Sequence, residues 1–195
     1  IFGYRQIRYC PQRQKAPPFR RKPESPRRRR ENSGRDYNES VRDLEFSEGD
    51  RRAMRRALRL AARAAADGEV PVGAAVYDDS GVVGEGENRV IRDCDPSAHA
   101  EIIALRAAAA ARRNYRLPEC KMAVTLEPCL MCAGAAFHAR LRAVVFAAVD
   151  PKTGAFGGAT SAHLNPLLNH RTAAAGGLLA DEAAALLRDF FRARR

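Results

Sequence analysis

The first strong pattern of apolar and polar positions predicts an amphipathic helix that begins near residue 47. Ser47 and Asp50 stand at the spacing of a capping box. Four apolar residues then fall at i, i+4, i+7 and i+11 on one stripe: Met54, Leu58, Ala61 and Ala65. Arginines repeat every four residues on another face: Arg51, Arg55, Arg59 and Arg63. That second face is typical of a solvated surface, and an RNA-facing surface is the alternative.

After this helix the pattern changes to short apolar runs separated by turns. Residues 70–77 and 82–86 are predicted to be strands, and the polar segment 78–81 between them predicts a hairpin turn. Further strands are predicted over residues 122–126 and 144–148. Further helices are predicted over residues 98–111, 130–139 and 181–195. Strands that alternate with helices indicate an α/β fold, a three-layer α/β/α sandwich around a central mixed sheet.

Composition places a boundary within the chain. Its 195 residues are 46% apolar, which is enough for one core, and no apolar run approaches the length of about 18 residues that a membrane span needs. Residues 1–42 hold 13 Lys and Arg against 4 Asp and Glu, a net charge of +9, whereas residues 43–195 hold 21 against 19, a net charge of +2. We therefore predict a disordered basic Arg- and Pro-rich extension over residues 1–42 and a folded domain over residues 43–195. The extension is either a basic arm that captures RNA or a dispensable tail.

The cysteines indicate the compartment. There are five, an odd number that fits poorly with the disulfide framework of a secreted protein: Cys10, Cys94, Cys120, Cys129 and Cys132. The first residues also lack the apolar stretch of a signal peptide. We expect a reducing, cytoplasmic location.

Two short motifs, each at the start of a predicted helix, carry the candidate chemistry. His99 opens one helix, and Cys129 and Cys132 lie three residues apart in the first turn of the next, so both thiols can face one site. Two thiolates and one imidazole suit tetrahedral zinc, and three protein ligands leave a fourth position for water, which is the catalytic pattern. We predict one zinc ion per subunit, held by His99, Cys129 and Cys132.

Glu101 is the candidate catalytic residue. Two residues after His99, it would project about 200° away if both were fully helical, but at an irregular helix start it can lie beside the metal. A carboxylate there can accept a proton from water and return it later. A redox dithiol and a closed structural site completed by Cys94 remain alternatives. Neither alternative needs Glu101 or the proline before Cys129. These two residues are part of the signature of the zinc deaminases.

Longer segments resemble the bacterial tRNA adenosine deaminase family, a branch of the cytidine-deaminase-like superfamily. The similarity runs from about residue 44 to the end of the chain and is carried by residues 70–74, 99–102, 126–135, 150–155, 169–171, 179–182 and 190–192. Four positions depart from the family's common pattern: Glu87, Val90, Phe156 and Gly158. The resemblance implies a cytidine-deaminase-like fold and a homodimer. It also implies conversion of the wobble adenosine of a tRNA anticodon, chiefly that of an arginine tRNA, to inosine.

The resemblance further implies a set of residues that bind the anticodon stem-loop. They are Asn88, which would hydrogen-bond the splayed base, and Asp150, Lys152, Asn169, Phe191 and Arg195. One rival is a deaminase of a free base such as guanine, and a second is a non-catalytic RNA-binding protein stabilised by zinc. Basic residues near the C-terminus favour a polynucleotide substrate, because a free base needs no phosphate contacts.

Overall fold

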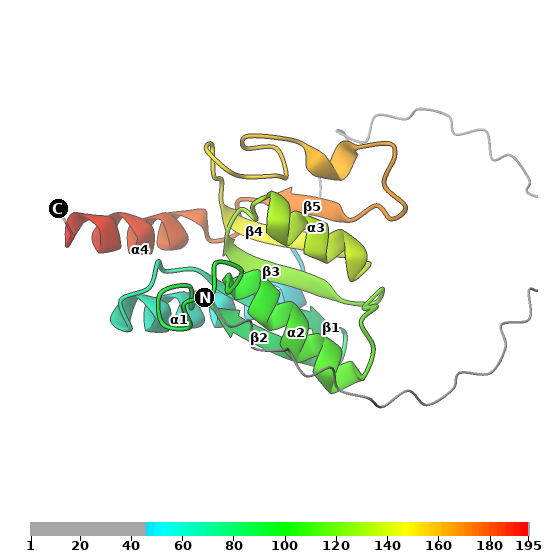
Figure 1. Cartoon of the computed structure of the whole chain (residues 1–195), viewed down its shortest axis with the longest axis horizontal. Helices are drawn as coiled ribbons and strands as arrows, with labels where there is room; N and C mark the ends of the chain where they lie inside the picture. Colours follow the sequence, from blue (N-terminus) through cyan, green and yellow to red (C-terminus); the bar gives the residue numbers. More distant parts are fainter. Residues whose placement is uncertain (1–45, 195) are drawn as a thin grey trace, which may run out of the picture. The chain divides into compact units, whose positions relative to one another are not determined.

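Five strands form one mixed sheet in the computed structural model, which describes residues 46–194 (Figure 1). The strands are β1 (Gly73–Asp78), β2 (Gly81–Glu87), β3 (Lys121–Leu126), β4 (Ala143–Ala148) and β5 (Ala173–Gly176). Their order is β2-β1-β3-β4-β5, with β1 antiparallel to both neighbours and the pairs β3–β4 and β4–β5 parallel. The predicted extension over residues 1–42 and the candidate RNA-binding residue Arg195 lie outside the described residues.

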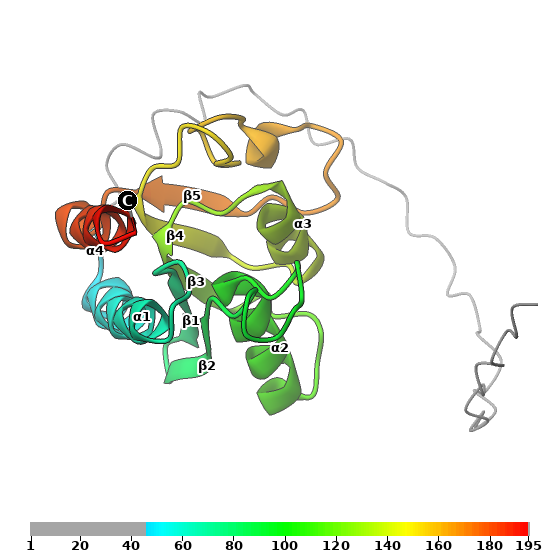
Figure 2. The same ribbon diagram turned by 60° about the vertical axis from the view of Figure 1, so that its left-hand side comes forward.

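Helices cover both faces of the sheet, which confirms the predicted three-layer sandwich. They are α1 (Glu48–Ala66), α2 (Ala100–Arg112), α3 (Leu130–His138) and α4 (Ala180–Arg192), with a short 3₁₀ helix η1 (Ala162–Leu164). Helices α1 and α4 pack on one face and α2 and α3 on the other (Figure 2). Within residues 46–194 no helix is long and apolar enough to cross a membrane.

The strands are apolar at consecutive positions because both faces of the sheet are covered. In β1, Ala74 and Val76 contribute to the core under α2 and α3, whereas Ala75 and Tyr77 contribute to the core under α1 and α4. Helix α1 lies very close to β1, since a Cβ placed on Gly73 would stand 2.1 Å from the carbonyl oxygen of a residue in α1. The glycine is what permits that approach.

The predicted capping box at the start of α1 is confirmed. The Ser47 hydroxyl accepts from the Asp50 amide at 3.1 Å, and the Asp50 carboxylate accepts from the Ser47 amide at 2.9 Å. Asp50 also accepts from the Tyr77 hydroxyl at 2.5 Å and the Lys121 ammonium at 3.0 Å. Burial raises the pKa of Asp50, but these hydrogen bonds outweigh it and leave the pKa below its ordinary value.

Several predicted boundaries need correction. The strand predicted over residues 70–77 begins at Gly73, because Pro71 has no amide hydrogen for a strand ladder. The last helix ends at Arg192. Strand β5 and helix η1 were not predicted. On the arginine face of α1, Arg59 is exposed, as a solvated surface requires, and Arg63 forms an ion pair with Glu87. Neither observation tests RNA binding, and the RNA-facing alternative stays a prediction.

Candidate active site

Two helix N-termini bring three metal-ligating side chains together. His99 is the N-cap residue of α2 and Cys129 that of α3, and neither side chain caps its helix, so both remain available as ligands. Cys132 lies in the first turn of α3 and is fully buried. Its Sγ is 3.5 Å from His99 Nδ1, and Cys129 Sγ is 3.7 Å from the same nitrogen. The three ligand atoms lie within 4.8 Å of one another, the one such group found in residues 46–194.

These distances fit a tetrahedral zinc ion. Bond lengths of about 2.0 Å to nitrogen and about 2.3 Å to sulfur at a tetrahedral angle place nitrogen and sulfur ligands about 3.5 Å apart. Cys94 does not belong to the group: it is exposed, and its thiol donates to the Ile91 carbonyl oxygen at 3.6 Å. The geometry therefore favours an open site with three protein ligands over the closed site completed by Cys94.

The two thiols titrate as a pair. A hydrogen bond from Cys132, and then one with His99, lower the pKa of Cys129 to about 3. The same hydrogen bond and burial raise the pKa of Cys132 above its ordinary range. Both ligands bind a metal as thiolates, and the positive charge of a divalent metal stabilises that form.

Glu101 lies beside this group in a cavity of about 330 Å³, the size of a small ligand site. The cavity is lined by His99, Cys129, Glu101, Asn88, Asp150 and Glu69, among others. His99 has an extended backbone at the N-cap, which explains how it and Glu101 reach one cavity although they are only two residues apart. Glu101 is 4% exposed, and burial raises the pKa of its carboxyl.

Glu127, a residue that the sequence reasoning did not single out, organises the loop that follows β4. Glu127 is 2% exposed, and its carboxylate accepts from the backbone amides of Asp150 at 3.0 Å, Phe156 at 2.8 Å and Gly158 at 2.9 Å. The loop is also bridged to the metal-ligand segment through Cys129 and Gly154. The sequence signal that could have identified Glu127 is its position, as a single acid directly after an apolar strand.

A second hollow, of about 670 Å³, lies between this loop and α4, and we call it the basic groove. It is lined by Lys152, Leu187, Arg188, Phe191, Arg192 and Arg194. Phe191 is 50% exposed, whereas its neighbour Phe190 is buried and covered by the Arg194 guanidinium at 3.6 Å from the ring centre. Phe191 is therefore accessible to a ligand in the groove, whereas Phe190 belongs to the core.

The predicted RNA-binding residues fall into separate places. Asn88 and Asp150 line the cavity with the metal ligands, whereas Lys152 and Phe191 line the basic groove. Asn169 is exposed and lines neither; it lies in a third hollow beside residues of α3.

The matches with known proteins agree with this site. Residues 47–148 match the model of the cytidine and deoxycytidylate deaminase zinc-binding region, and the chain belongs to this family.

Within that family, the tRNA-specific adenosine deaminase of Haemophilus influenzae is 49% identical over 150 residues, which cover 76% of this chain and 87% of that protein. A solved structure from a study of A-to-I editing by tRNA:A34 deaminases has a TM-score of 0.68 and 38% identity, covering 70% of this chain and 99% of the other. The guanine deaminase of Nitrosomonas europaea has a TM-score of 0.61 and 30% identity, covering 72% of this chain and 83% of the other.

Proposed function

We propose that this protein is a zinc-dependent hydrolase that converts adenosine to inosine at the wobble position of a tRNA anticodon, chiefly that of an arginine tRNA. One observation carries the proposal: a metal-ligating group, a buried acid and a buried amide meet in a single cavity. The similarity to tRNA-specific adenosine deaminases is higher than that to the guanine deaminase, which supports a tRNA substrate.

In this proposal His99, Cys129 and Cys132 hold the zinc ion. When bound, zinc lowers the pKa of water so that hydroxide is available near neutral pH. Glu101 accepts the proton of the attacking water and delivers a proton to N1 of adenine as the new bond to C6 forms. The Glu101 carboxylate then takes the proton of the new hydroxyl group on C6 and passes it to the amine, so that the C6–N bond breaks, ammonia leaves and the 6-oxo group of inosine remains. Burial of Glu101 beside the ligands keeps this proton path out of bulk solvent.

The cavity has room for a single base rather than a stacked strand, so the target nucleotide must be splayed out. An anticodon loop is already nearly single-stranded, which lowers the free-energy cost of that step. Asn88 and Asp150 then contact the nucleotide in the cavity, while Lys152 binds phosphate and Phe191 stacks on a neighbouring base. Asn169 and Arg195 keep the RNA-contact role that the family implies.

The test is a comparison of substrates. Zinc-loaded protein is incubated separately with the anticodon stem-loop of an arginine tRNA, adenosine, guanine and cytidine, and the products are separated chromatographically. We expect inosine from the stem-loop and little turnover of the free compounds. A stem-loop with cytidine at the wobble position is the matched control and should not react. Preferential turnover of guanine would contradict the tRNA assignment.

The same proposal includes a homodimer located in the cytoplasm. Large apolar side chains at the start of α3, Leu130 and Met131, are exposed in the single chain and suit a subunit contact. The four cysteines in residues 46–194 are free thiols, as a reducing compartment requires. Sedimentation equilibrium should give twice the chain mass, and a monomer at micromolar concentration would contradict the dimer.

We also propose that residues 43–195 are sufficient for the chemistry. Deleting residues 1–42 removes a net charge of +9, so stem-loop binding should weaken at low salt while the single-turnover rate at saturating RNA stays unchanged. An inactive truncated protein would contradict this division.

A further inference from the structure

Glu69 is a buried acid in the cavity for which the proposed chemistry has no use. It lies between α1 and β1, is 1% exposed, and its backbone amide donates to the Ala64 carbonyl oxygen at 2.9 Å. It lines the cavity but is not one of the three metal ligands. A buried carboxylate is costly unless it is hydrogen-bonded, so its partners indicate its role.

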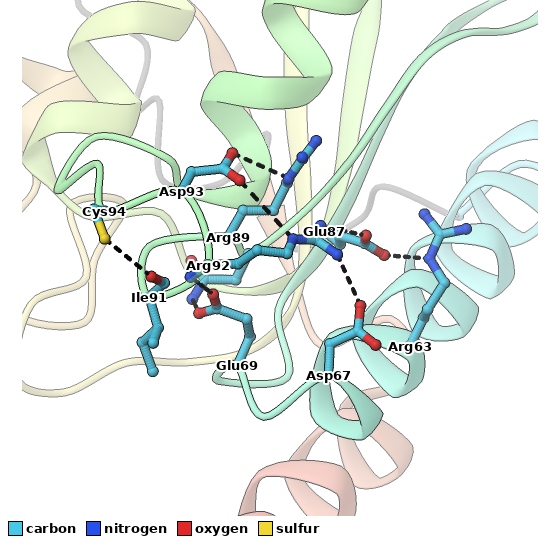
Figure 3. Close-up of polar contacts among 10 residues, drawn as sticks. Arg63, Asp67, Glu69, Glu87, Arg89, Ile91, Arg92, Asp93 and Cys94 are labelled. Atoms are coloured by element: carbon cyan, nitrogen blue, oxygen red, sulfur yellow. Dashed lines mark hydrogen bonds and ion pairs between the residues drawn. The ribbon is translucent and has the colours of Figure 1, made fainter.

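The carboxylate of Glu69 has two partners. Its Oε1 accepts from the backbone amide of Arg92 at 2.7 Å, a contact visible in Figure 3. Its Oε2 accepts from Nδ2 of Asn88 at 3.3 Å. The first bond fixes the carboxylate to the loop after β2, and the second connects it to the side chain that is proposed to bind the base.

Asn88 has a side chain whose two ends are nearly equal in shape and opposite in hydrogen bonding. Its backbone is fixed, because its amide donates to the Val72 carbonyl oxygen at 3.0 Å, and the residue is 8% exposed. The direction of the side-chain amide is therefore the remaining freedom. Both oxygens of Glu69 accept hydrogen bonds, Oε1 from the Arg92 amide and Oε2 from Asn88, so Glu69 selects the orientation in which Nδ2 of Asn88 faces it. Oδ1 and one N–H hydrogen are then left for a ligand.

We propose that Glu69 is a positioning residue that fixes the Asn88 amide in one orientation, so that the substrate base meets an acceptor and a donor in a fixed order. An amide free to turn offers either group at either place and discriminates poorly between bases. A fixed amide pairs with only one arrangement of donor and acceptor on the edge of the base. The identity of the substrate rests on the proposed function, whereas the orientation of Asn88 does not.

A neighbouring carboxylate provides a matched control. Glu87 is also buried and binds the same loop, but it does so through the Arg92 guanidinium at 3.1 Å, and it also forms an ion pair with Arg63 of α1 (Figure 3). The other end of that guanidinium binds Asp67 at 2.9 Å. Removing the charge of Glu87 therefore perturbs the loop anchor without changing the group that faces Asn88.

The decisive variant is Glu69→Gln. It keeps the size of the side chain and an oxygen that can accept from the Arg92 amide, but it places a donor opposite Nδ2 of Asn88. The Asn88 amide should then turn so that its Oδ1 accepts from the new donor.

The first readout is the side-chain amide signal of Asn88 in the NMR spectrum of the full-length, zinc-loaded protein, assigned by its loss in Asn88→Ala. We expect this signal to shift in Glu69→Gln and to stay in place in Glu87→Gln. An unshifted signal in Glu69→Gln would overturn the proposal whether or not the protein deaminates RNA. If Glu69→Gln does not fold, Glu69→Asp serves instead, because it withdraws the carboxylate from Asn88 and carries the same expectations.

The second readout is kcat/KM on the anticodon stem-loop. Glu69→Gln should lower it about tenfold or more and Glu87→Gln less than about threefold. In the Asn88→Ala background, adding Glu69→Gln should cost less than about twofold further, because the two residues act through one contact. An equal loss in both backgrounds would assign Glu69 a different role. A wild-type protein that does not convert the stem-loop contradicts the proposed function, and the NMR result then decides the positioning role alone.

Discussion

The cavity and the basic groove place polar groups in opposite ways. In the cavity Glu69, Asn88 and Glu101 are buried, and Asn88 is held by the carboxylate of Glu69. In the basic groove Lys152, Phe191 and Arg192 are exposed on a loop and one helix. Buried, hydrogen-bonded groups hold one geometry, as proton transfer and base selection require, whereas exposed cations bind phosphates, which carry no information about base identity. We therefore expect the cavity to determine the rate and the identity of the product, and the groove to determine affinity and its salt dependence.

The largest effect should follow from removing a metal ligand in the cavity. His99→Ala should lose zinc, measured by elemental analysis, and inosine formation should fall to the uncatalysed level, because two thiolates alone hold zinc poorly. Cys94→Ala is the matched control and should keep both zinc and activity, since Cys94 is exposed and outside the group. Loss of zinc in Cys94→Ala would instead support the closed site in which Cys94 is the fourth ligand.

The next largest effect should come from the acid. Glu101→Gln preserves the shape of the side chain but cannot carry the proton, so kcat should fall about 10²–10⁴-fold while zinc content stays at one per chain. Single-turnover rates on the stem-loop, measured with elemental analysis on the same sample, test this. If zinc were lost together with activity, Glu101 would be a support of the metal site rather than the proton carrier.

A smaller effect of a different kind is expected in the groove. Phe191→Ala should raise the KM for the stem-loop by the equivalent of about 1–3 kcal/mol for one lost stacking contact and leave kcat unchanged. Phe190→Ala is the matched variant: because Phe190 is buried, it should lower the free energy of unfolding by about 3–5 kcal/mol. A lower melting temperature with an unchanged KM in Phe191→Ala would show that this aromatic is structural too.

The smallest effect should come from Asp50, which lies outside both regions. Its pKa is lowered in the folded chain, so the stability it contributes is present above its ordinary pKa of 3.8 and is lost as the pH falls through the lowered value. Asp50→Asn should therefore cost on the order of 1 kcal/mol at neutral pH, and the difference from wild type should shrink below about pH 4. Urea unfolding at several pH values measures this, and activity at pH 7 should not change.

Features whose cause is local were predictable from the sequence. The capping box of α1 needs only Ser47 and Asp50, and it is present. The Cys129–Cys132 pair needs only the first turn of α3, and the structure places both thiols beside His99. Helix periodicity, capping and ligand spacing all act within a few residues, so the chain displays them directly.

Features whose cause lies elsewhere in the chain were not predictable. Strand β5 is Ala-Ala-Ala-Gly, which has little strand preference, and it exists because it pairs with β4. Glu69 finds its amide partner 19 residues away, and Glu127 accepts from Gly158, 31 residues away. Two of the three backbone amides that donate to Glu127 belong to Phe156 and Gly158, where the chain departs from the family pattern. A backbone amide is present at almost every residue, so its hydrogen bond leaves no mark in the sequence. The sequence shows an acid at each position but not what it binds.

The three amides bound by Glu127 also limit how the surface of this protein can change over evolution. Pro151, Lys152 and Thr153 are exposed, but the loop that carries them must keep returning three N–H groups to one buried carboxylate. An insertion or deletion within residues 150–158 would leave that carboxylate unsatisfied directly beside the segment that bears Cys129. New RNA preferences should therefore arise in this loop by substitution at constant length.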